Sequence, residues 1–103
     1  MSETRKADPA RAIIAQIVAA LIPAKAEVIS AKSVDWASAT FTGARHEFEF
    51  MVSGDDADVA AKHVVQKVGD INFTIGGHIV ADIVAEYRGS KILFIEALSV
   101  EAD

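Results

Sequence analysis

An alternating stretch from Trp36 to Val52 constrains the fold of this chain more than any other feature. Successive side chains of a β-strand point to opposite faces, so alternation of apolar and polar residues indicates strands with one buried face. A two-residue turn at Gly43-Ala44 would fold the stretch into a β-hairpin that pairs Phe41 with His46. The residues predicted to face the core are Ala37, Ala39, Phe41, His46, Phe48 and Phe50. The opposite face would carry Trp36, Ser38, Thr40, Thr42, Arg45, Glu47, Glu49 and Met51.

The second half of the chain repeats the sequence pattern of the first half. Gly89 aligns with Gly43 and Phe94 aligns with Phe48 without a gap. Matching lengths and the repeated order helix, strand, strand are what a duplicated α-β-β unit would leave. Two unrelated α-β-β units would share the same periodicity, so both interpretations stay open.

Residues 79–88 and 91–100 predict a second hairpin around Gly89-Ser90. Its predicted inward set is Tyr87, Ala85, Ile83 and Ala81 with Ile92, Phe94, Glu96 and Leu98. Its predicted outward set is Val80, Asp82, Val84 and Glu86 with Leu93, Ile95, Ala97 and Ser99. An apolar patch of Trp36, Met51, Val80, Val84, Leu93 and Ile95 then lies on the side away from the helices. Because large exposed apolar patches mark interaction sites, we expect a second copy of the chain to cover it.

Two amphipathic helices are expected to cover the inner face of the sheet. Asp8-Pro9 is a typical helix start, and Pro23 ends that helix at Ile22. Its apolar face is Ile13, Ile14, Ile17, Val18, Leu21 and Ile22. The second helix runs from about Asp56 to Val68, with a thinner apolar stripe of Val59, Ala60, Val64 and Val68. Residues 26–34 read as extended, and we expect a break near residues 33–35 because an unbroken strand would be unusually long.

These elements predict a two-layer α+β sandwich with the order α-β-β-α-β-β. Both helices would lie on one face of a four-stranded antiparallel sheet, with the second and fourth strands in the centre. This order resembles a permuted ferredoxin-like plan whose first strand has moved to the end, and the resemblance is one of element order alone. We expect a flexible N-terminus over residues 1–7, a single domain over 8–100 and a short tail over 101–103.

Composition excludes several functional classes. The net charge of −5 and the absence of a basic cluster argue against binding a nucleic-acid backbone. No apolar run approaches the roughly 20 residues that span a bilayer. The chain has no cysteine, which excludes a disulfide framework, and it begins without the apolar segment of a signal peptide. We therefore expect a soluble cytoplasmic protein that uses neither a nucleic acid nor a membrane as partner.

Three polar residues in unusual positions are the candidates for chemistry. His46 ends an inward-facing row of aromatic residues, and a histidine titrates near neutral pH. His78 follows Gly76-Gly77, a pair that permits close approach of a ligand, although a bend or bulge is the simpler interpretation. Glu96 takes an inward position where burial would raise the pKa of its carboxyl group, unless a bulge turns it outward.

The favoured interpretation is a self-associating binding or structural module, a homodimer through the open sheet face, without catalytic chemistry of its own. One alternative is a cofactor-independent enzyme or small-molecule binder with a pocket near His46, His78 and Glu96. Another is an accessory protein that binds a different chain through the outer face. No cofactor is expected, and the three histidines lack the close spacing of metal ligands.

Overall fold

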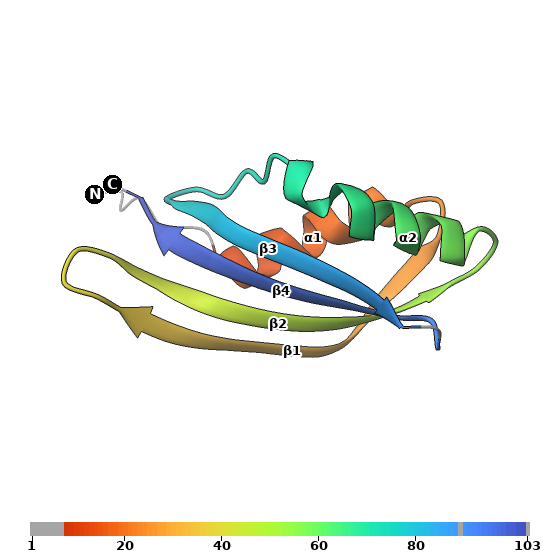
Figure 1. The fold of residues 1–103 in the computed structure, drawn as a ribbon, viewed down its shortest axis with the longest axis horizontal. Helices are drawn as coiled ribbons and strands as arrows, with labels where there is room; N and C mark the ends of the chain where they lie inside the picture. Colours follow the sequence, from red (N-terminus) through yellow and green to blue (C-terminus); the bar gives the residue numbers. More distant parts are fainter. Residues whose placement is uncertain (1–7, 89, 103) are drawn as a thin grey trace, which may run out of the picture.

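The computed structural model describes residues 8–88 and 90–102, so the predicted flexible N-terminus and the last residue lie outside it. Its elements are α1 (Pro9–Leu21), β1 (Lys25–Ala37), β2 (Thr42–Ser53), α2 (Ala57–Lys67), a 3₁₀ turn (Val68–Asp70), β3 (His78–Arg88) and β4 (Ile92–Glu101). Four antiparallel strands form one sheet in the order β1-β2-β4-β3, and both helices lie on the same face of it (Figure 1). The predicted α+β class and the order α-β-β-α-β-β are confirmed.

Helix α1 begins as its sequence predicts. The Asp8 carboxylate accepts hydrogen bonds from the backbone N–H groups of Ala10 (3.0 Å) and Arg11 (3.4 Å). Pro9 fills the first helical position, where its missing N–H costs nothing. The helix ends one residue earlier than predicted, at Leu21, and Ile22 is 70% exposed instead of contributing to the apolar face.

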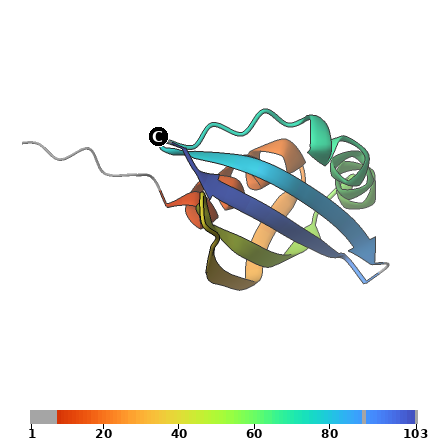
Figure 2. The ribbon, with the colours of Figure 1, turned by 60° about the vertical axis from the view of Figure 1, so that its left-hand side comes forward.

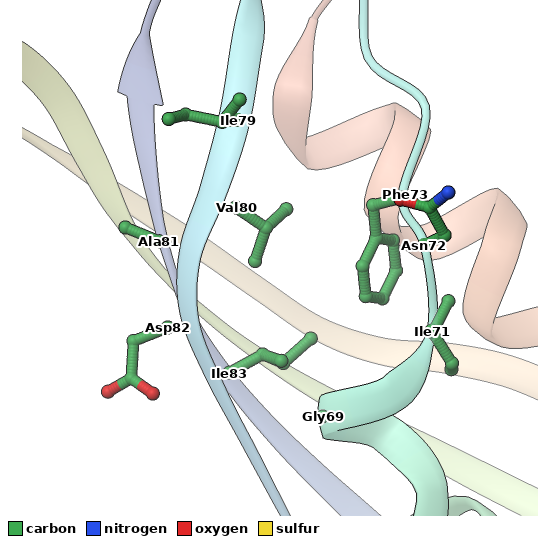
Figure 3. A pocket seen from close by; sticks show the side chains of 9 residues that line it. All are labelled: Gly69, Ile71, Asn72, Phe73, Ile79, Val80, Ala81, Asp82 and Ile83. Atoms are coloured by element: carbon green, nitrogen blue, oxygen red, sulfur yellow. The ribbon is translucent and has the colours of Figure 1, made fainter.

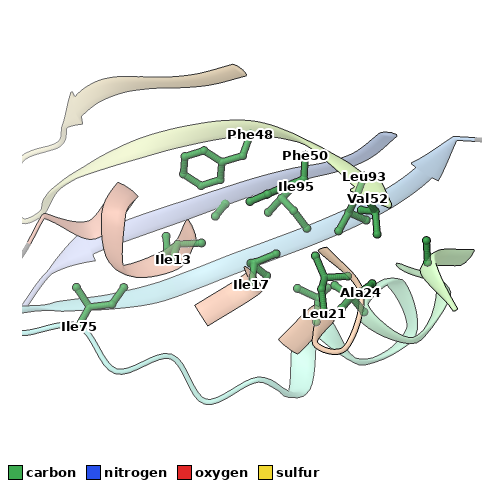
Figure 4. Packing of buried hydrophobic residues seen from close by; sticks show 14 residues of the cluster. Ile13, Ile17, Leu21, Ala24, Phe48, Phe50, Val52, Ile75, Leu93 and Ile95 are labelled. Carbon is green, nitrogen blue, oxygen red and sulfur yellow. The ribbon is translucent and has the colours of Figure 1, made fainter. Parts of the chain in front are cut away.

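The core lies between α1 and the two central strands (Figure 4). Ile13, Ile17 and Leu21 of α1 are fully buried. They share one apolar cluster with buried residues of the sheet, which include Phe48, Phe50, Val52, Leu93 and Ile95. Full burial of such a side chain contributes about 1.5–3 kcal/mol before entropy is counted, so this cluster is the main source of stability.

The first hairpin turns four residues earlier than the sequence predicts. Its loop is 38–41, closed by bonds between Ser38 and Phe41, and Ser33 lies opposite His46. The predicted inward set of the second strand, His46 with Phe48 and Phe50, is confirmed, because these side chains are buried. Ala37 lies on the inner side of β1, as predicted, but it pairs with Thr42 and not with Phe50. The inward placement of Ala39 and Phe41 is wrong, because both lie in the loop, where Phe41 is 56% exposed. The predicted turn residue Gly43 instead lies inside β2.

Strand β1 is a long edge strand. It runs through 13 residues, and the predicted break near residues 33–35 is replaced by an irregularity between Val28 and Ser30. The hairpin of β1 and β2 extends beyond the ends of both helices (Figure 1). The sheet is also twisted, so that β3 and β4 run obliquely across β1 (Figure 2). As a result, most of β1 is exposed on both of its sides.

The second hairpin has a connection one residue longer than predicted. Arg88 pairs with Ile92, and Lys91 has the positive φ of 68° that often closes a three-residue connection. A slip of one residue moves every side chain of a strand to the opposite face. The buried residues of β4 are therefore Leu93, Ile95, Ala97 and Ser99, and the outward residues are Ile92, Phe94, Glu96 and Leu98. The predicted facing of β4 is wrong.

The predicted facing of side chains is partly confirmed in strand β3 and helix α2. Ile83, Ala85 and Tyr87 lie on the inner face, as predicted. An irregularity between Val80 and Asp82 turns Val80 inward as well, against the prediction. In α2 the buried residues are Ala57, Ala61 and Val64, whereas Val59 is 68% exposed. Within the described residues, no helix has the length and apolar character needed to cross a membrane.

Candidate functional site

The three residues predicted to share a pocket do not share one. His46 is 1% exposed on the inner face, whereas Glu96 points to the outer face beside Glu47. His78 lies at the start of β3, where its Nδ1–H donates to the Gly76 carbonyl oxygen (3.1 Å). The glycine pair forms a tight bend, with Gly77 at φ 79°, between the bridged residues Ile75 and His78. Of the two orientations that the sequence leaves open for Glu96, the structure has the outward one, and its cause is the one-residue slip of β4, not a bulge near Ala97.

His46 is the centre of a polar network on the inner face. Its Nδ1 is 2.7 Å from the Ser33 hydroxyl on β1, and its Nε2 is 2.8 Å from the Ser99 hydroxyl on β4. The imidazole stacks on Phe48, with ring centroids 5.8 Å apart. Ser99 is fully buried, whereas Ser33 is exposed. The network therefore connects three strands and reaches solvent only on the β1 side.

The tautomer of His46 with the proton on Nε2 is the one that satisfies all three bonds of this network. The Ser99 hydroxyl donates to the Ala44 carbonyl oxygen (3.4 Å), so its lone pairs are free to accept from His46 Nε2–H. Nδ1 then holds the lone pair and accepts from the Ser33 hydroxyl. Burial lowers the pKa of His46 below the ordinary value of 6.5, while the nearby Asp8 and Asp35 carboxylates raise it and His78 lowers it further. The ring is thus held neutral at neutral pH.

The predicted interface residues divide between the two faces. Trp36, Met51 and Val84 lie on the outer face, as predicted. Leu93 and Ile95 are fully buried in the core, and Val80 packs against it, so these three cannot belong to an outer patch. The slip of β4 and the irregularity in β3 are the physical reasons.

A different apolar surface occupies one end of the outer face. We name it the distal patch: Val34, Trp36, Phe41, Ile79, Leu98 and Val100. One hollow of about 430 Å³ is lined by Val34, Trp36 and Leu98, together with Asp35 and Arg45. A second hollow of about 390 Å³ brings the loop residue Phe41 together with Ile79 and Val100. Val34, Phe41 and Ile79 are each more than half exposed, which is unusual for large apolar side chains gathered in one place.

Trp36 packs on the glycine that the sequence suggests as a turn. It pairs with Gly43, and a Cβ atom at Gly43 would lie 3.0 Å from the indole and 2.0 Å from the Ser99 carbonyl oxygen. Only glycine permits this close approach. The indole Nε1 is buried and, within the described residues, has no hydrogen-bond acceptor.

The centre of the outer face is acidic. Glu47 lies opposite Glu96 on the neighbouring strand, and Glu49 is the next outward residue of β2. We name these three residues the acidic centre. Lys32 pairs with Glu47 from β1, and at the far end the Arg88 guanidinium lies over the Phe94 ring, 5.3 Å from its centroid. Like charges on directly opposed residues repel, so this centre is poorly suited to face a copy of itself.

A groove runs along the edge of β3 (Figure 3). It has a volume of about 280 Å³ and lies between β3 and residues 69–73. Val80 and Ile83 point from β3 toward Phe73 and Ile71, while Asp82 points away from them (Figure 3). Among the described residues that line the groove, Asn72 and Asp82 carry the polar side chains, and the others are apolar or glycine.

Among the described residues, no three histidine, aspartate or glutamate side chains are arranged to hold a metal ion. Sequence reasoning found His46 but missed Ser33 and Ser99, because both contacts depend on strand register. It also missed Val34, Phe41, Ile79, Leu98 and Val100 of the distal patch. Comparison with known proteins yields no family model, no curated protein and no solved structure that matches this chain, so the ferredoxin-like plan stays a resemblance of element order.

Proposed function

We propose that this chain is a small self-associating binding module and that the distal patch is the contact surface of a homodimer. The observation that carries the proposal is the gathering of six apolar side chains from three strands and a loop at one uncovered end of the sheet. Removing an apolar surface of this kind from water lowers the free energy, which favours contact with a partner.

The charges of the outer face favour a limited contact over stacking of whole sheets. Full two-fold stacking would oppose two acidic centres. A two-fold axis that lies between the two sheets, perpendicular to the strands and within the distal patch, keeps the two acidic centres at opposite ends of the dimer. Such an axis places Val34 over Trp36 of the other copy and Leu98 over Val100, so apolar residues meet apolar residues.

The same arrangement also brings Arg45, the cation beside the distal patch, into contact with the other copy. Arg45 would lie over Gly43 of the other copy, where the Trp36 indole packs on the glycine, so the guanidinium would meet that indole. A guanidinium over an aromatic face is favourable by about 0.5–2 kcal/mol. A two-fold contact repeats every such interaction, which is what a self-complementary surface requires.

The size of the patch predicts a weak dimer. Four strands about 4.8 Å apart and two rows of side chains cover roughly 300 Å² per copy, below the roughly 800 Å² per partner of a standard interface. We expect a monomer–dimer equilibrium in the micromolar range or weaker, measured by sedimentation equilibrium over a series of concentrations.

Val34→Glu tests the proposal against a matched control, Val59→Glu. Both valines are exposed, 58% and 68%, but Val59 lies on α2 in the other layer of the fold. The Val34 variant should remain monomeric at concentrations where the parent and the Val59 variant dimerise. A parent chain that stays monomeric throughout would overturn the proposal and leave the distal patch to a different protein, and equal effects of the two variants would also contradict it.

A further inference from the structure

We propose that Ser33 is an activated nucleophile and His46 its general base, and that the pair transfers acyl groups from small carboxylic esters. The proposal is independent of self-association, because Ser33 faces the inner side of β1 and the distal patch lies on the outer side. His46 is the one buried titratable side chain in the described part of the chain that is hydrogen-bonded to a solvent-exposed hydroxyl, that of Ser33. The proposal gives this pair a role.

The geometry matches the requirements of a serine nucleophile. A hydroxyl and its base must lie within about 2.6–3.2 Å, with the base oriented by a third group. The Ser33 hydroxyl is 2.7 Å from Nδ1, and the Ser99 hydroxyl holds Nε2 from the opposite side at 2.8 Å. Ser99 in turn is fixed by its bond to the Ala44 carbonyl. In the tautomer with the proton on Nε2, the lone pair of Nδ1 is directed at the Ser33 hydroxyl, the exposed hydroxyl of the network.

The surrounding charges suit a base that becomes cationic during the reaction. Burial keeps His46 neutral in the resting protein, so it is ready to accept a proton. Asp35 on β1 and Asp8 at the start of α1 both favour the imidazolium, and His78 on β3 opposes it. These carboxylates would supply, through their field, the stabilisation that a third acidic member supplies in a hydrolase triad.

The edge position of Ser33 provides hydrogen-bond donors for a developing oxyanion. Strand β1 has a neighbour on one side only within the described sheet. Alternate backbone N–H groups along such an edge are free of the ladder. Free backbone N–H groups beside the nucleophile are the donors that stabilise a tetrahedral intermediate. Ser33 lines none of the hollows described above, so the proposal is limited to simple esters whose acyl group needs no enclosed pocket.

The reaction balances without a cofactor. Ser33 Oγ attacks the ester carbonyl carbon while its proton passes to His46 Nδ1. The bond between that carbon and the alcohol oxygen then breaks, and the leaving alkoxide takes the proton from Nδ1. Water repeats the sequence on the acylated serine, giving the carboxylic acid and returning the proton to Ser33 Oγ.

The first test uses a fluorophosphonate probe, which forms a bond between Ser Oγ and phosphorus with loss of fluoride. Peptide mass mapping should find the adduct on Ser33 and not on Ser30, an exposed serine of the same strand that faces the outer side. Ser33→Ala should abolish labelling, and Ser30→Ala should leave it unchanged. Labelling of Ser33 no faster than labelling of Ser30 would overturn the proposal.

The second test addresses the base. His46→Gln should slow labelling by about 100-fold or more, the usual contribution of a general base. Because that substitution alters the core, Ser99→Ala provides a milder variant that frees Nε2 and should also slow labelling. In the parent chain the labelling rate should fall as His46 gains a proton, at a pH below 6.5. A rate that ignores both substitutions and this titration would refute His46 as the base.

The third test addresses turnover. p-Nitrophenyl acetate should give a burst of nitrophenol equal to the concentration of protein, followed by slower release as acyl-Ser33 hydrolyses. Ser33→Ala should remove the burst. A burst that survives in Ser33→Ala would show that another group is acylated and would contradict the proposal.

Discussion

Replacing Phe48 with alanine tests which side of the sheet meets the helices. The Phe48 ring is fully buried, stacked on His46 and in edge contact with Phe50 at 6.3 Å. Truncation of a buried phenylalanine costs about 3–5 kcal/mol, since the lost transfer free energy adds to a cavity. Total stabilities of domains are about 5–15 kcal/mol. Phe48→Ala should therefore remove a large share of the free energy of unfolding.

Phe94→Ala is the matched substitution on the other face. Phe94 is half-buried and its ring lies under the Arg88 guanidinium. Loss of that contact and of part of the buried area should cost about 1–2 kcal/mol. The two variants should thus differ by about 2–3 kcal/mol, although the sequence pattern treats the two phenylalanines as equivalent positions.

Urea unfolding followed by circular dichroism, with linear extrapolation, measures both free energies. The fluorescence of Trp36, the one tryptophan in the chain, gives an independent probe of the same transition. Equal losses for Phe48→Ala and Phe94→Ala would refute the reasoning, because they would mean that β4 turns Phe94 toward the helices. Small losses for both would mean that the core is not where Phe48 lies.

Three further predictions concern single sites. Gly43→Ala should destabilise by about 2 kcal/mol or more because its Cβ would meet a backbone oxygen at 2.0 Å, while Gly69→Ala, with open space around it, should be neutral or stabilise by up to about 1 kcal/mol in the same assay. Folding lowers the pKa of His46, so the contribution of the neutral ring to the free energy of unfolding is complete above pH 6.5 and is lost as pH falls through the folded pKa. Urea unfolding at several pH values should show this loss of free energy. His46→Gln should make the free energy of unfolding less dependent on pH in this range. The Tyr87 hydroxyl donates to Asp58, which raises its pKa to about 12, and Asp58→Asn should return the ultraviolet titration of this single tyrosine toward 10.

The two hairpins explain why the sequence predicts one central strand and not the other. In β2 the inward residues Phe48 and Phe50 alternate with charged Glu47 and Glu49, so one assignment of faces is clearly better. In β4 apolar residues occupy both faces, and the alternation cannot choose between them. The choice then depends on the length of the connection, which the positive φ of Lys91 extends to three residues. No local pattern in the sequence announces that conformation.

Glycine in a strand has two physical meanings, and Gly43 illustrates both. As a turn residue it would supply a positive φ, which is how the sequence suggests a hairpin there. In the fold it instead lets the Trp36 indole and a carbonyl of β4 approach the backbone. The actual loop is closed by the side chain of Ser38, whose hydroxyl accepts from the backbone N–H of Phe41 (3.1 Å). A serine turn of this kind is a weaker signal than glycine, so the glycine pattern misleads.

The network around His46 depends on both hairpins at once. Local alternation turns His46 inward correctly, but with a turn at Gly43 its cross-strand neighbour would be Phe41 in place of Ser33. Ser99 reaches the same imidazole only because the longer second connection turns it inward. An error of one residue in either register would separate the three side chains. Probe labelling at Ser33 that depends on both His46 and Ser99 would therefore verify the two registers together with the chemistry, whereas variants of the hydrophobic core test only one strand at a time.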